Sequence, residues 1–414
     1  MGKALIHIFK IYKADRSGSA LCFTTKMQKY FFLLLTVLIL SFFFNAEVIS
    51  QWLPDSSADD HTRRGVDFIY SLQFDSAKSE FNYLIKIKPD HPAGYFFLAM
   101  VEWWKILIDL NNKERDDYFY SLLEKVINMC DKKLDSNQDD VTALFFKGGA
   151  IGFRGRLRVH REEWLLAAND GRLAIPIVHR AYKIEPNNVD ILLGMGIYNY
   201  YRDVIPEEYP FVKPFVVFFP SGDRMLGIQQ LRQASEKARY ANIEATYFLI
   251  QILSNYEKQY SQALPLAHEL YKSYPSNPVF HRYVGRLYST LGKWEDMHKI
   301  YTEIVERSLA SQIGYNTSTL REAYFYLGLY GMNYSKLDSA LQYFYKCDEL
   351  SRALDVGEQS GFMVLSNLKI GMIYDIQNKR ELAVKQYNKV LSMNDHKGSR
   401  EMAKKHINKP YGQY

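Results

Sequence analysis

Two consecutive stretches of the chain share one pattern of small and apolar residues, shifted by 34 positions. Ala263 and Leu270 have the same spacing as Met297 and Ile304. Within each copy, apolar residues three and four apart mark one helix face, and a turn leads into a second helix. Two helices this short cannot bury their own apolar faces, so each pair must stack on others of its kind. The pattern therefore predicts an all-α solenoid.

The same offsets recur along residues 58–397 and predict about eight helical pairs. The clearest copy is the first, which carries Gly65, Phe68, Ala77, Phe81, Leu84 and Pro89. Two pairs are elongated: in the second and third copies, about fourteen or fifteen extra residues separate the markers of the two helices. Fourteen residues are close to four helical turns, so each helix of these pairs can be about two turns longer. Residues 398–414 are expected to form a capping helix and a tail.

The repeat spacing resembles that of the tetratricopeptide (TPR) repeat, with a small eighth residue, an aromatic eleventh, an alanine at position twenty and a proline near the end. The resemblance implies a right-handed superhelical solenoid whose first helices line a concave groove for a protein or peptide partner. At the groove positions it implies these partner-binding residues: Phe96, Trp103, Tyr200, Phe248, Arg282, Arg286 and Phe325. Arg282 and Arg286 are one turn apart and are the expected anchors for an acidic segment.

The fourth pair is interrupted by a long insertion at residues 201–224. Its four prolines, at positions 206, 210, 214 and 220, exclude a continuous helix. We expect the apolar segment Phe215–Pro220 to lie against the concave face. The alternative is contact with a membrane surface, although the segment lacks the basic amphipathic helix typical of such anchors.

The insertion ends in the residues SGDR. Asp223 is expected to cap the helix that begins at Arg224, which leaves Arg224 free to bind a carboxylate or phosphate. The elongated repeats and this loop resemble a branch of the TPR family found in bacterial envelope proteins and in eukaryotic inclusion-body clearance proteins. No metalloprotease motif, nucleophile elbow or phosphate loop is present, so no catalytic residue, cofactor or metal ligand is predicted. An unrecognised hydrolase that uses the SGDR loop is the weaker alternative.

The N-terminal region has the features of a targeting segment. Tyr30–Phe44 is an uncharged apolar run that follows Lys26 and Lys29. Fifteen residues are short for a bilayer core, which needs about 20, but suit a secretory signal. Residues 1–50 are therefore predicted to be a signal peptide, with Met27 as the alternative start, and residues 51–57 a linker. Without cleavage, the run would be a transmembrane anchor with the repeats outside.

Charge and cysteines narrow the function further. The first fifty residues hold six basic and two acidic residues and so carry a net charge of +4. Subtracting this from the net charge of +6 of the whole chain leaves about +2 for the remaining residues. A charge this small gives no general case for nucleic-acid binding. Arg154, Arg158 and Arg161 share one helix face and are expected to be solvated or ion-paired. Cys130 and Cys347 are expected in the core.

The sequence thus predicts a non-enzymatic, protein- or peptide-binding scaffold of the bacterial cell envelope. It would be periplasmic, or anchored to the inner membrane through its N-terminal segment. The alternative is a membrane-associated structural protein whose groove is occluded by its own residues.

Overall fold

The computed structural model describes residues 52–53, 55–208, 210, 213 and 219–412. Contacts divide the chain into two units, residues 1–54 and 55–414, and the second unit holds every described helix. Over the described residues there are 17 α-helices and one π-helix, with no β-strand. The predicted signal or anchor, residues 1–50, lies outside the described residues. Within them, no helix combines the length and apolarity that crossing a bilayer requires.

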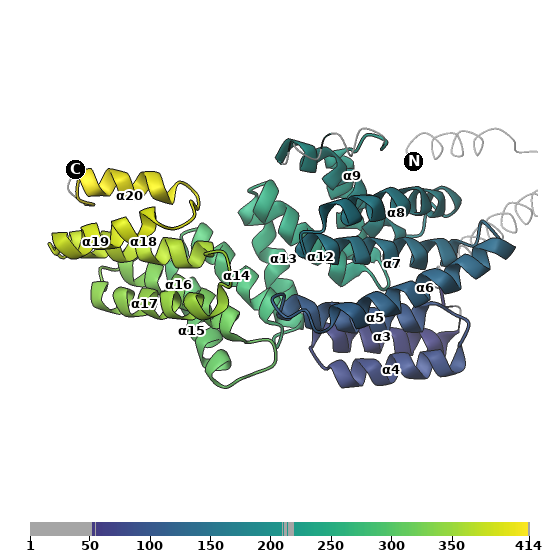
Figure 1. Cartoon of the computed structure of the whole chain (residues 1–414). Coiled ribbons are helices and arrows are strands. Elements are labelled where there is room, and N and C mark those ends of the chain that lie inside the picture. The colour runs from purple at the N-terminus through teal and green to yellow at the C-terminus, as the bar shows by residue number, and fades with distance from the viewer. Residues whose placement is uncertain (1–51, 54, 209, 211–212, 214–218, 413–414) are drawn as a thin grey trace, which may run out of the picture. The chain divides into compact units, whose positions relative to one another are not determined.

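The helices form eight consecutive hairpins, and each hairpin contacts the next (Figure 1). In chain order they are α3 (Ser56–Tyr70) with α4 (Phe74–Ile87), α5 (Ala93–Ile108) with α6 (Asp116–Ser136), α7 (Val141–His160) with α8 (Trp164–Ile184), α9 (Ile191–Glu208) with α11 (Arg224–Lys237), α12 (Asn242–Gln251) with α13 (Tyr260–Ser273), α14 (Pro278–Thr290) with α15 (Trp294–Leu309), α16 (Thr317–Asn333) with α17 (Leu337–Leu354), and α18 (Gly361–Ile376) with α19 (Arg380–Leu391). The π-helix Ile252–Tyr256 extends α12, and α20 (Ser399–Asn408) packs on the last hairpin. The predicted all-α solenoid of about eight hairpins is confirmed.

In the first, sixth, seventh and eighth hairpins, a glycine in the first helix contacts an aromatic ring in the second. A Cβ atom on Gly65 would lie 2.4 Å from the Phe81 ring, and one on Gly328 would lie 2.7 Å from the Phe344 ring. Real Cβ atoms do not approach other atoms so closely. In these four hairpins the small eighth residue is required because the ring sixteen positions later occupies its side-chain space.

Replacing Gly328 with Ala is expected to lower the free energy of unfolding by about 1–3 kcal/mol, the usual cost of overpacking. The added methyl group collides with Phe344. The matched control is Gly152→Ala in α7, because an added Cβ there has no atom within 4 Å and alanine is the better helix former by about 1 kcal/mol. Urea denaturation of both variants tests the prediction, and equal effects of the two changes would contradict it.

The third hairpin has the predicted elongation. Its helices α7 and α8 contain 20 and 21 residues. Gly148 meets Val178, thirty positions later, whereas Gly65 meets Phe81 after sixteen positions. The fourteen extra residues are thus shared between the two helices on either side of the turn. In the second hairpin the extra length lies mainly in α6, which has 21 residues, and in the connection 109–115.

In the fourth hairpin, the first part of the predicted insertion at 201–224 is helical. Helix α9 continues through Pro206 to Glu208, eight residues into that range. A proline near a helix end removes one ladder hydrogen bond without stopping the last turn. The described end of the insertion returns to α9, because Tyr198 Oη donates to the Pro220 carbonyl oxygen at 2.6 Å. Residues 215–218, most of the expected cover, lie outside the described residues, so that hypothesis stays a prediction.

Two of the first helices are apolar and buried on nearly every side. Twelve of the 16 residues of α5 are buried, and α12 is buried throughout 243–250. A surface helix normally exposes one face, so these helices need cover from a second direction. Distant hairpins supply it: the Trp104 ring of α5 lies 5.8 Å from the ring of Tyr247 in α12 and 5.5 Å from that of Phe280 in α14. The first six hairpins are therefore joined by more than neighbour contacts.

Candidate binding surface

The aromatic residues predicted to line the groove are all buried, with at most 8% of each residue exposed. They are Phe96, Trp103, Tyr200, Phe248 and Phe325. Phe96, for example, packs edge-on against Phe146 at a ring distance of 5.3 Å. Side chains this buried can contact a partner only after a rearrangement. Their role as partner contacts stays a prediction.

Arg282 and Arg286 come together on one carboxylate, that of Glu322 in α16. Arg282 Nε donates to Glu322 Oε2 at 2.9 Å, and Arg286 Nε donates to Oε1 at 2.6 Å. The Nη2 atoms of both arginines also donate to this carboxylate. Tyr301 Oη completes the set at 3.1 Å. Among the described residues, the two Nη1 groups have no hydrogen-bond partner, and the side chains keep 24% and 37% exposure.

The charges of this cluster are fixed near neutral pH. Burial by itself would raise the pKa of the Glu322 carboxyl, but the two guanidinium groups outweigh burial and lower this pKa to about 2. Two positive charges therefore share one negative charge. The cluster has a net charge of +1 and, counting only the described residues, two Nη1 donors without a partner.

A second arginine site, around Arg156 of α7, was not anticipated. Its Nη1 donates to Glu244 Oε1 of α12 at 2.6 Å. The guanidinium carbon lies 4.7 Å from the ring centroid of Trp103 and 4.4 Å from that of Phe248. Tyr70 Oη donates to the other oxygen of Glu244 at 3.3 Å. One sequence feature points to this pairing. No acidic residue stands three or four positions from Arg156 on its own helix, so an ion-pair partner had to come from another helix.

The neighbouring arginines of α7 form ion pairs, which was one of the two expected outcomes. Arg154 and Arg158 both bind the buried carboxylate of Asp170. Arg161 Nε donates to Asp116 at 2.6 Å. These three arginines stabilise the elongated hairpins and are poor candidates for an anion site.

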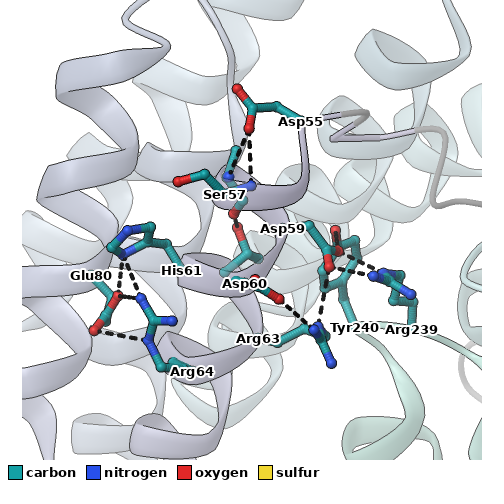
Figure 2. A network of polar contacts seen from close by, with 12 residues as sticks. Asp55, Ser57, Asp59, Asp60, His61, Arg63, Arg64, Glu80, Arg239 and Tyr240 are labelled. Atoms are coloured by element: carbon teal, nitrogen blue, oxygen red, sulfur yellow. Dashed lines mark hydrogen bonds and ion pairs between the residues drawn. The ribbon is translucent and has the colours of Figure 1, made fainter.

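Asp59 of α3 is another buried carboxylate, and like Glu244 it joins distant parts of the stack. Figure 2 shows Arg239 and Tyr240, from the connection between α11 and α12, beside it. Arg239 Nε donates to Asp59 at 2.6 Å, and Arg63 Nε donates from the next turn of α3 at 3.1 Å. Burial would raise the pKa of Asp59, but the hydrogen bonds from Arg239 and Tyr240 lower it overall. The first hairpin is thereby tied to the fourth and fifth.

The SGDR loop caps α11 and holds a glutamate. Asp223 accepts a hydrogen bond from the Leu226 backbone N–H at 2.9 Å, as expected for an N-cap. Arg224 is paired rather than free: its Nε and Nη2 donate to Glu257 at 2.7 and 2.8 Å. Tyr200 Oη donates to the same carboxylate at 2.6 Å. The structure thus brings together two predicted site residues, Tyr200 and Arg224.

His281 of α14 is a fully buried histidine beside the arginine pair in sequence. Its Nδ1 lies 3.0 Å from Tyr315 Oη, and its ring stacks on Tyr271 at 4.3 Å. Burial, followed by the charge of Arg307, lowers the pKa of His281 to about 3. Glu303 is 3.5 Å from Nε2 but is already paired with Arg307.

This histidine should make the fold sensitive to acid. An unfolded histidine takes up a proton below pH 6.5, whereas buried His281 does so only near pH 3. The unfolded state binds more protons in that window, so stability should fall as the pH drops from about 6.5 to about 3. His281→Gln should flatten this part of the pH profile, measured by urea denaturation. A similar flattening in the partly exposed control His396→Gln would contradict the assignment.

The described part of the chain shows no candidate metal centre. No cluster there of three or more His, Cys, Asp or Glu could hold a metal ion. Cys130 and Cys347 are buried free thiols, and burial raises their pKa values to about 12 and about 11. The structural interpretation of these two cysteines is confirmed.

Comparisons with known proteins find similarity only among solved structures. No protein-family model matches the sequence, and no curated protein matches it. The C-terminal part of a TPR repeat-containing protein from Cytophaga hutchinsonii is 16% identical, with 70% of this chain and 95% of that one covered and a TM-score of 0.34. A Rap protein complexed with Competence and Sporulation Factor is 10% identical over 86% and 97%, with a TM-score of 0.42. The human IFIT1 dimer with PPP-AAAA is 12% identical over 86% and 87%, with a TM-score of 0.40. At these levels, the similarities say nothing about what this chain binds.

Proposed function

We propose that the chain is a non-catalytic scaffold that binds an acidic peptide or protein segment at Arg282 and Arg286. One observation carries this proposal: two partly exposed guanidinium groups share the single carboxylate of Glu322, and their Nη1 donors have no hydrogen-bond partner in the described part of the chain. Charge-assisted, bidentate hydrogen bonds make arginine well suited to carboxylate and phosphate ligands. Glu322 holds both side chains in place, which reduces the entropy lost on binding.

We further propose that the scaffold works at the bacterial cell envelope. The support is the apolar run Tyr30–Phe44 with its preceding lysines, which is typical of an export signal. Fractionation of cells that produce a C-terminally tagged chain, together with sequencing of the mature N-terminus, tests this location. Recovery of the full-length chain in the cytosol would refute export.

Binding of an acidic peptide should depend on Arg286. A fluorescent peptide with four glutamates interspersed with leucines is the probe, and the same peptide with glutamines is its control. Loss of a charged hydrogen bond costs about 1.5–3 kcal/mol, so Arg286→Ala should weaken binding by about 10- to 150-fold in fluorescence anisotropy. Higher salt should weaken wild-type binding.

The matched control for this experiment is Arg172→Ala. Arg172 is an exposed arginine of α8 whose hydrogen bonds within the described residues go to Asn169 alone. The control should bind the acidic peptide like the wild type. Equal affinities of Arg286→Ala and Arg172→Ala, or equal affinities for the glutamate and glutamine peptides, would rule out the proposed site.

A second candidate, a structural envelope protein with a self-occluded groove, is favoured by the Arg156 site. There, Trp103 and Phe248 are buried against a guanidinium group that already has its carboxylate. In this case the chain would be retained in the envelope fraction, with no binding that depends on Arg282 or Arg286.

A further inference from the structure

The first hairpins contact hairpins five to seven, far outside the neighbour contacts of a simple solenoid. Asn277 Nδ2, before α14, donates to the carbonyl oxygen of Tyr70 at the end of α3, at 3.0 Å across 207 positions. Asn316 Nδ2, before α16, donates to the carbonyl oxygen of Ile108 at the end of α5, at 2.9 Å across 208 positions. We use the name clasp for a set of long-range contacts. On one side are α3, α5 and α7. On the other side are α12, α14 and the connections that precede α12, α14 and α16.

The rim of the clasp is polar and reaches solvent. Arg239, which binds Asp59, keeps 38% of its side chain exposed. Tyr274 Oη donates to the exposed carboxylate of Asp67 at 2.8 Å. Water can replace hydrogen bonds at such an exposed rim when the two sides separate. Separation would not leave Asp59 without a partner, since Arg63 on its own helix still binds it.

Inside the clasp, α12 is bound in the way that a ligand helix would be. Glu244 and Phe248 stand four positions apart, hence on one face of α12. Glu244 binds Arg156 at 2.6 Å, and the Phe248 ring lies 4.4 Å from the guanidinium carbon. Trp103 covers the guanidinium group at 4.7 Å. One side of the clasp thus recognises an acidic residue and an aromatic residue on successive turns of a helix.

We propose that the clasp is an autoinhibitory contact: it opens reversibly, and the released surface of Trp103 and Arg156 binds a partner helix that carries an acidic and an aromatic residue four positions apart. Helix α12 occupies that surface in the closed chain. The surface is distinct from Arg282 and Arg286, so this inference does not depend on the function proposed for them.

Distances between spin labels across the clasp test the opening. The labels are placed at Ser57→Cys in α3 and Lys299→Cys in α15, both exposed, in the full chain with Cys22→Ser. Cys130 and Cys347 are buried and should not react. The probe is a synthetic peptide of residues 240–256 with two lysines added at each end for solubility. The control peptide carries Glu244→Gln and Phe248→Ala.

The probe peptide should raise the fraction of long label distances by at least about tenfold, whereas the control peptide should leave it unchanged. Arg156→Ala in the chain should raise that fraction without peptide and remove the response to peptide. If circular dichroism shows that Arg156→Ala fails to fold, Arg156→Lys replaces it, because lysine keeps the charge but loses the planar fork. A single distance distribution that is insensitive to the peptide, or equal responses to both peptides, would overturn the proposal.

Discussion

Replacing Glu322 with Leu is expected to lower the free energy of unfolding by about 3 kcal/mol. Removal of one partner from a buried ion pair usually costs about 3–5 kcal/mol, because the remaining charge is left without compensation. Here two guanidinium groups lose their shared carboxylate. We expect the lower end of that range because 37% of the Arg286 side chain reaches solvent, which screens its charge. Urea denaturation of the purified chain measures the effect.

The control for Glu322→Leu removes all three charges together. In the triple variant Arg282→Met, Arg286→Met and Glu322→Leu, apolar side chains replace the whole cluster, and such exchanges are often neutral. The triple variant should therefore recover most of the lost stability, while binding of the acidic peptide stays abolished. A triple variant less stable than Glu322→Leu alone would show that the arginines stabilise the fold by other contacts.

Trp104→Ala is expected to cost about 3–5 kcal/mol, the range for truncation of a large aromatic residue in a core. Trp104 is 1% exposed. Its ring lies 4.9 Å from that of Tyr70 in α3, and it also packs on Tyr247 and Phe280 in two later hairpins. One truncation therefore weakens contacts among hairpins one, two, five and six.

The matched control is Trp294→Ala in α15. Trp294 is only partly buried, and it packs against the local core of the sixth and seventh hairpins. Its truncation should cost less and should leave the first five hairpins as resistant to proteolysis as in the wild type. Equal losses of stability, or local unfolding of the second hairpin alone in Trp104→Ala, would show that the clasp does not couple the hairpins.

The candidate site could be predicted only in part. Arg282 and Arg286 stand one turn apart, so their joint position on α14 follows from the sequence. Their partner Glu322 stands forty and thirty-six positions later, at the second position of the next repeat. Successive first helices lie side by side, so this carboxylate was within reach by repeat geometry. The pairing depends on how far one hairpin turns against the next, which no spacing specifies.

The sequence by itself determined that this chain folds into stacked helical hairpins, because the pattern of small and apolar residues acts within one repeat of 34 positions. Gly65 and Phe81 illustrate this, since one leaves the space that the other fills. Only the tertiary structure decided that the first hairpins close onto later ones. The all-round apolar α5 indicated that extra cover was needed, but the position of α12 and α14 beside it depends on small rotations added over several hairpins. These rotations depend on the packing between repeats. A residue pattern within one repeat therefore cannot predict their sum.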